Sequence, residues 1–131
     1  MGAPGDAAYT RRLLVFDANI GYGGQRGGHA SIPAANLAVE QFGKATGAYE
    51  AVFSNDLANF KYENLRRFDA VFLNNSVGQI FVDPEVRAGL SRFVREGGGL
   101  AGYHGVSHVS MDWPEFREFD RASTTVMSAY V

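Results

Sequence analysis

The 131-residue chain is long enough for one globular domain, and its 46% hydrophobic and 20% charged residues are an ordinary balance for a soluble protein. Its formal net charge is −2 and its twelve Lys and Arg residues are scattered, which argues against a nucleic-acid partner because phosphate recognition needs a basic patch. The sequence has no cysteine, which excludes a disulfide framework, a thiolate nucleophile and a Cys-based metal site.

The N-terminal residues MGAPGDAAYTRR contain no apolar segment typical of a secretory signal. No apolar run reaches the roughly 20 residues that a membrane-spanning helix needs. We therefore expect a cytoplasmic protein without a membrane partner. The composition leaves homo-oligomerisation open.

Four short apolar runs are predicted to be strands of one sheet. Each run is continuous rather than alternating, which is typical of parallel strands covered on both faces. The runs are LLVF (13–16), EAVF (50–53), AVFL (70–73) and LAGY (100–103).

Helical patterns separate these runs. Residues 31–46 are predicted to form a helix with Ser31 as N-cap and Pro33 in the first turn. One helical turn is expected within YENLRRF (62–68). The next helix has Asp83 as N-cap and Pro84 at its first position, and it ends at Gly97. The apolar face of the helix at 31–46 comprises Ala35, Ala38, Val39 and Phe42. The apolar face of the helix that begins at Pro84 comprises Val86, Leu90, Phe93 and Val94.

Strands that alternate with helices predict right-handed βαβ units and an α/β fold with three layers, α/β/α. We expect a mainly parallel, flavodoxin-like sheet with strand order 2-1-3-4. Beyond Trp113 the pattern predicts a helix at 114–122 and a strand within TTVMSAYV (124–131). Residues 1–12 are interpreted as a tail and 13–131 as the domain.

Ligands of open parallel sheets bind at the carboxyl ends of the strands, near the switch in strand order. All four predicted strands are followed by polar side chains, which indicates a polar crevice there. These side chains belong to Asp17, Asn19, Ser54, Asn55, Asp56, Asn74, Asn75, Ser76, His104 and Ser107.

The glycine-rich segment GYGGQRGGHAS (21–31) follows the first strand but does not match a dinucleotide-binding motif. A GxGxxG window that starts at Gly21 has Arg26 at its sixth position, and the loop is too long for the tight turn of that motif. The segment is interpreted as a lid, an anion-binding loop or a surface loop.

Two histidines are the candidate acid/base residues. His104 lies in the sharp turn of GYHG after the fourth strand, where some α/β enzymes place a nucleophile. His29 precedes a helix N-terminus, whose positive dipole favours a neutral imidazole suited to a general base or a metal ligand. The alternative for each is a structural histidine.

A metal site and a sugar-stacking residue are further alternatives. His108 and Asp112 follow His104 at spacings of four, so a zinc-like divalent metal could be held by His29, His104, His108 and Asp112. Trp113 could stack on a sugar ring or act as a packing residue.

The chain resembles the ThuA-like (trehalose utilisation) family, whose fold is related to class I glutamine amidotransferases. The resemblance runs from about Leu13 to about Phe116 and rests on four segments in order: GGHASIP (27–33), FKYENLRRFDAVFLNN (60–75), GGGLAGYHG (97–105) and DWPEF (112–116). Because the family domain is longer, the resemblance implies that this chain covers its N-terminal portion. Many members have Arg where this chain has Gly28 and an acidic residue where it has His108.

The resemblance implies that His29 and His104 are site residues, with Asn74 and Asp112 as neighbours. It also implies a role in carbohydrate metabolism, with a disaccharide or keto-sugar derivative as substrate and no resident cofactor assigned. A histidine in place of the amidotransferase cysteine excludes glutamine hydrolysis through a thioester. We expect His104 and His29 to act by acid/base chemistry, with substrate contacts from Asp17, Asn74, Asn75, Ser107, Asp112 and Trp113. The alternatives are a non-catalytic carbohydrate-binding or interaction module, an inactive partial domain and a metal-dependent hydrolase.

Overall fold

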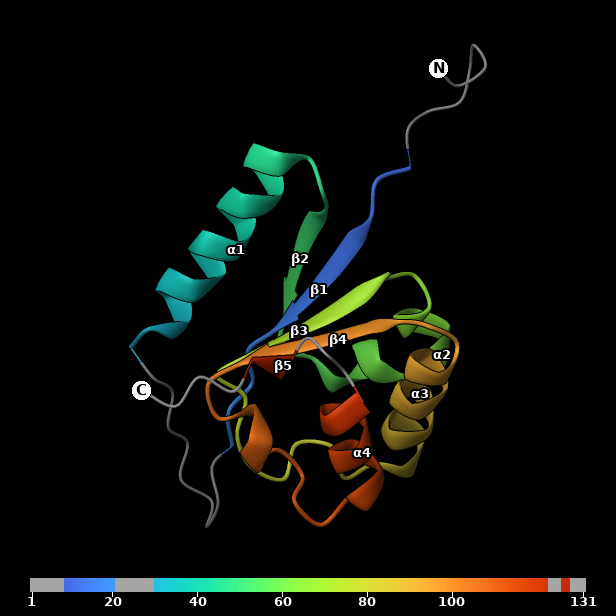
Figure 1. Cartoon of the computed structure of the whole chain (residues 1–131). Helices are drawn as coiled ribbons and strands as arrows, with labels where there is room; N and C mark the ends of the chain where they lie inside the picture. Colours follow the sequence, from blue (N-terminus) through green and yellow to red (C-terminus); the bar gives the residue numbers. More distant parts are fainter. Residues whose placement is uncertain (1–8, 21–29, 123–125, 128–131) are drawn as a thin grey trace.

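The computed structural model describes residues 9–20, 30–122 and 126–127. Its centre is a five-stranded parallel sheet with the order β2-β1-β3-β4-β5, which confirms the predicted arrangement 2-1-3-4 (Figure 1). The four predicted strands are each found within one residue of the expected ends. The strands are β1 Arg12–Phe16, β2 Glu50–Ser54, β3 Ala70–Asn74, β4 Gly99–Tyr103 and β5 Val126–Met127.

Helices cover the two faces of this sheet unequally. Helix α1 (Ile32–Thr46) lies on one face, and α2 (Tyr62–Leu65), α3 (Pro84–Arg95) and α4 (Pro114–Ala122) lie on the other (Figure 1). Two 3₁₀ turns complete the order, η1 (Leu57–Phe60) before α2 and η2 (Val106–His108) before α4. This division follows from right-handed crossovers, because only the first connection runs toward the β2 edge.

The ends of α3 agree with the sequence, whereas the start of α1 agrees in position but lacks the expected side-chain cap. Asp83 accepts a hydrogen bond from the Glu85 backbone N–H at 2.8 Å, and Gly97 follows the helix with φ +94°. Ser31 occupies the predicted N-cap position, and its carbonyl accepts a hydrogen bond from the Ala35 N–H at 2.9 Å, but its side chain makes no cap bond. Its backbone is already helical (φ −77°, ψ −12°), and an N-cap side chain needs an extended backbone to reach the first free N–H groups.

The hydrophobic core lies between the sheet and α3 and α4. Aromatic rings form its centre: Phe60 packs edge-on against Phe16 and Phe81, with ring centroids 4.9 and 4.8 Å apart. The cluster continues from Phe81 to Trp113 and on to Phe116. Each of these five side chains is at most 6% exposed, so this face supplies most of the hydrophobic stabilisation.

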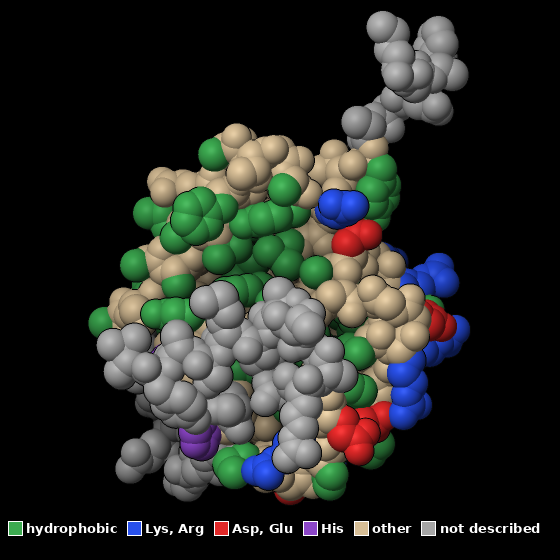
Figure 2. All heavy atoms as spheres, viewed as in Figure 1, with side chains coloured by type: hydrophobic (Ala, Val, Ile, Leu, Met, Phe, Trp, Pro, Cys, Tyr) green, Lys and Arg blue, Asp and Glu red, His purple; other side chains and the backbone are tan. Residues whose placement is uncertain are grey.

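The α1 face buries much less apolar surface. Phe42 and Leu37 on α1 are 64% and 54% exposed, and Phe53 on β2 is 40% exposed. Of the predicted apolar stripe, Phe42 is exposed, and Ala35, Ala38 and Val39 are half-buried. Apolar side chains gather over α1 and the neighbouring strands, while acidic and basic side chains gather at the opposite edge of the view (Figure 2). None of the described helices is long and apolar enough to cross a membrane.

Candidate functional site

Three amides and one carboxylate form a hydrogen-bonded chain at the carboxyl ends of β1 and β3. Asn75 Nδ2 donates to Asn74 Oδ1 at 2.6 Å, and Asn74 Nδ2 donates to Asn36 Oδ1 at 2.9 Å. Asn36 Nδ2 in turn donates to Asp17 Oδ2 at 3.0 Å. Residues from β3, from α1 and from the segment after β1 are thus joined into one polar unit, which we call the amide chain.

The direction of every bond in the amide chain is fixed by its chemistry. An ionised carboxylate only accepts hydrogen bonds, so Asn36 must present its NH₂ group to Asp17 and its oxygen to Asn74. Independently, Asn74 Nδ2 also donates to the Ile32 carbonyl at 3.1 Å, and that oxygen too can only accept. All three amides therefore donate toward Asp17.

Burial decreases along the amide chain. Asn74 and Asn75 are fully buried, and Asn36 and Asp17 are half-buried. Buried polar groups cost free energy unless they are hydrogen-bonded, so the paired amides stabilise an arrangement that ends in a partly exposed carboxylate. Asp17 and Asn36 are the members of the chain that a ligand could reach.

Asn75 also has a special backbone conformation. Its φ is +55°, a left-handed value that Asn tolerates better than most residues. Its N–H donates to the Tyr103 carbonyl at 3.0 Å, and its carbonyl accepts a bond from Asn19 Nδ2 at 2.9 Å. Its Oδ1 is buried without a hydrogen-bond partner among the described residues, as is Gln79 Oε1.

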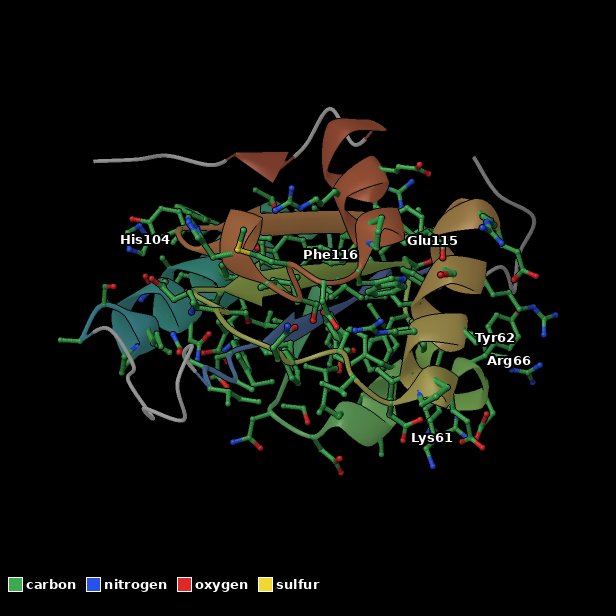
Figure 3. All side chains as sticks on the ribbon, turned by 90° about the horizontal axis from the view of Figure 1, so that it is seen from below. Lys61, Tyr62, Arg66, His104, Glu115 and Phe116 are labelled. Atoms are coloured by element: carbon green, nitrogen blue, oxygen red, sulfur yellow. The ribbon has the colours of Figure 1, made fainter. Side chains whose placement is uncertain are left out.

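His104 follows β4 in a left-handed turn, with φ +46° at His104 and +75° at Gly105. The predicted sharp turn is therefore present. A Cβ at Gly102 would lie 2.4 Å from Val106 Cγ2, and one at Gly105 would lie 2.4 Å from Val77 Cγ2. Glycine is thus required on both sides of the histidine, whose half-buried side chain lies at one end of the molecule, opposite Lys61, Tyr62 and Arg66 (Figure 3).

The structure brings Asp17, Asn74 and Asn75 together, as expected for substrate-binding residues at neighbouring strand ends. It places Asp112 elsewhere, in an ion pair with Arg87 at 3.1 Å. Trp113 is 6% exposed within the aromatic cluster, which leaves little indole surface for a sugar and agrees with the packing interpretation. His29 and the Ser107 side chain lie outside the described residues.

The metal-ligand hypothesis gains no support from the described part of the chain. Within it, no group of three or more His, Cys, Asp or Glu side chains is arranged to hold a metal ion. His108 lies on the short turn η2 rather than on a helix that continues from His104, so the spacing of four does not place the two imidazoles on one helix face.

Asn36 was missed by the sequence reasoning. It occurs at a polar position beside the apolar stripe of α1, where an amide is normally interpreted as solvent-facing. The available signal was its spacing, because Asn36 lies one helical turn after Ile32, whose carbonyl shares the same Asn74 donor. A helix N-terminus that points at strand ends places such a residue beside the site.

A hollow of about 440 Å³ between α3 and α4 lies away from the strand ends. Its arginines are paired: Arg87 with Asp112, Arg92 with Glu96 and Arg95 with Glu115. Tyr62 also donates a hydrogen bond to Glu96. This bond and the one from Arg92 lower the pKa of the Glu96 carboxyl, while the bond to Glu96 raises the pKa of the Tyr62 phenol. Because the arginines already have carboxylate partners, we interpret this region as a structural ion-pair network.

One protein-family model matches most of the chain. The model described as trehalose utilisation, ThuA, matches residues 12–125. The chain belongs to the ThuA family. Its α/β fold and strand order are thus those expected from the family resemblance.

One solved structure supports the ThuA fold. A ThuA-like protein from Bacteroides uniformis is 20% identical and has a TM-score of 0.61. The alignment covers 90% of this chain and 47% of that chain, so this chain spans about half the length of its structural relative. Among curated proteins, none matches this chain.

Proposed function

We propose that this ThuA-family chain binds a carbohydrate at the carboxyl ends of β1, β3 and β4 and that His104 acts on it as a general acid/base. The substrate class is a disaccharide or a keto-sugar derivative. The observation that carries the proposal is the meeting of Asp17, Asn36, Asn74 and Asn75 in one hydrogen-bonded unit at these strand ends.

Sugar hydroxyls are recognised by groups of this kind. A carboxylate accepts hydrogen bonds from hydroxyl groups, and such charge-assisted bonds are roughly twice as strong as neutral ones. The positions of Asp17 and Asn36, half-buried at the outer end of the amide chain, allow a polar ligand to reach them. The family description of trehalose utilisation is consistent with a carbohydrate ligand.

In the proposed mechanism His104 moves a proton. It would remove a proton from a sugar hydroxyl, or from a carbon next to a carbonyl, and return it at a later step. Asp17 would orient the sugar by accepting a bond from a neighbouring hydroxyl. His29 is proposed as the second acid/base group, and no metal is needed for this chemistry.

The test is a turnover assay with a panel that contains trehalose and keto-sugar derivatives. His104→Ala should lower turnover by about 100-fold or more, the usual contribution of a general acid/base, while the melting temperature changes little. Turnover that survives this substitution undiminished would contradict the role of His104.

A non-catalytic carbohydrate-binding module is the alternative. It would retain the amide chain and bind sugars without turnover. Calorimetric titration with the same panel separates the two functions, because binding without turnover in the unsubstituted chain supports the module. Absence of both binding and turnover would contradict a carbohydrate role altogether.

A further inference from the structure

Resting on the proposed function, we propose that Asn36 is a positioning residue that holds the Asp17 carboxylate in the orientation needed to accept a sugar hydroxyl. Asn36 itself touches no reacting atom in this proposal. It acts through its 3.0 Å hydrogen bond to Asp17 Oδ2. This assigns to a residue of α1 a role in a site otherwise built at the ends of strands.

The first support is the rigidity of the amide chain behind Asn36. Asn74 is fully buried and donates to two acceptors, the Asn36 side chain and the Ile32 carbonyl. Asn75 is fully buried as well and is bonded through its backbone to Tyr103 and Asn19. On the side away from Asp17, Asn36 is therefore bonded to a buried amide that has further hydrogen-bond partners.

The second support is the polarity of the chain. The Asp17 carboxylate and the Ile32 carbonyl can only accept hydrogen bonds, and both fix the same direction of the chain, so Asn36 presents its NH₂ group to Asp17. A carboxylate has about four lone-pair positions, so one bond from Asn36 restrains its rotation while other positions can accept from a ligand. A pre-oriented carboxylate binds better than a rotating one because less rotamer freedom is lost on binding.

The third support is the change in burial along the amide chain. The fully buried amides are at the Asn75 end, and the half-buried pair is at the Asp17 end. An interaction needed only for folding would not have to end in a partly exposed carboxylate. The buried amides instead restrain the orientation of the partly exposed Asp17 carboxylate through Asn36.

The experiment uses the full chain with three substitutions. Asn36→Leu removes the donor, and Asn36→Asp retains the acceptor for Asn74 but places a second carboxylate beside Asp17. Asn64→Leu is the matched control, because Asn64 is also a half-buried helical asparagine with a hydrogen bond, from its Nδ2 to the Ala58 carbonyl at 2.9 Å.

The first readout is the side-chain rotamer of Asp17, measured from NMR three-bond couplings without ligand. We expect one χ1 rotamer in the unsubstituted chain and in Asn64→Leu, and averaging in Asn36→Leu. In Asn36→Asp we expect averaging at neutral pH, where two adjacent carboxylates repel, and return to one rotamer at acidic pH, where they share a proton. A packing defect alone would not be reversed by acid.

The second readout is affinity for trehalose and the keto-sugar panel. Loss of the fixed carboxylate should weaken binding by about tenfold in Asn36→Leu, the size expected for one hydrogen bond, and not in Asn64→Leu. If the unsubstituted chain binds no sugar, the proposed function fails, but the rotamer measurement still decides this inference. An averaged Asp17 rotamer in the unsubstituted chain, or one rotamer retained in Asn36→Leu, would overturn it.

Discussion

The two faces of the ThuA-family sheet are stabilised in different ways. On the α3 and α4 face, five aromatic side chains interlock and are almost completely buried. On the α1 face, one helix with exposed Phe42 and Leu37 is hydrogen-bonded to Tyr49, just before β2, and to Asn74 at the end of β3. The comparison indicates that folding stability resides mainly on the first face, whereas the second face contributes the polar groups of the candidate site.

The largest test of this difference is a pair of phenylalanine substitutions. Phe60→Ala should cost about 3–5 kcal/mol of unfolding free energy, because it leaves a cavity between Phe16 and Phe81. Phe42→Ala on the opposite face should change it by less than about 0.5 kcal/mol, because that ring is already in solvent. Urea unfolding measures both, and equal losses would contradict the proposed asymmetry.

A matched pair of glycines gives a smaller effect. A Cβ at Gly89 in α3 would lie 2.1 Å from the Phe60 backbone carbonyl, so Gly89→Ala should cost about 1–3 kcal/mol. A Cβ at Gly43 in α1 would lie 2.7 Å from the Tyr49 ring and 2.8 Å from the Tyr49 backbone carbonyl, which is a smaller overlap than at Gly89. Gly43→Ala should therefore cost less than Gly89→Ala, because both variants regain the same helix propensity, roughly 0.5–1 kcal/mol, and differ in the overlap. Thermal unfolding should rank the two variants in this order.

The smallest expected effect concerns charge on the outer surface of the packed face. Tyr62 and Arg92 lower the pKa of Glu96, so the ionised form is favoured in the folded chain. This stabilisation is present above the pKa of an unfolded Glu and is lost as the pH falls through the lower folded value. Tyr62→Phe should raise the pKa of Glu96 toward its ordinary value, which NMR titration of the carboxyl carbon measures. An unchanged pKa would show that the phenol does not contribute.

The strands and the order of the sheet were predictable because their signal is local. Continuous apolar runs such as LLVF mark buried parallel strands, and Pro84 after Asp83 marks a helix start with little ambiguity. Right-handed crossovers then restrict the order of the strands. The missing side-chain cap bond at Ser31 reflects a backbone angle that the residue type alone does not determine.

The candidate site was predictable only in part. Asp17, Asn74 and Asn75 were expected because they follow strands, and their meeting is a consequence of topology. The proposed role of Asn36 depends on its contact with Asn74, which is 38 positions away in the sequence. A local sequence pattern does not reveal such a contact. The pairing of Asp112 with Arg87 is equally non-local, and the contribution of His29 remains a prediction outside the described residues.

The bond from Asn74 to the Ile32 carbonyl has a further consequence for dynamics. It connects the first turn of α1 to the end of β3, and the hydrogen bond from Asn36, one turn later, connects the same helix to Asp17. Local opening of α1, the helix with the more exposed apolar side chains, would therefore release the carboxylate together with the helix. The lifetime of the assembled site is then limited by a sub-global fluctuation of one helix rather than by the stability of the aromatic core.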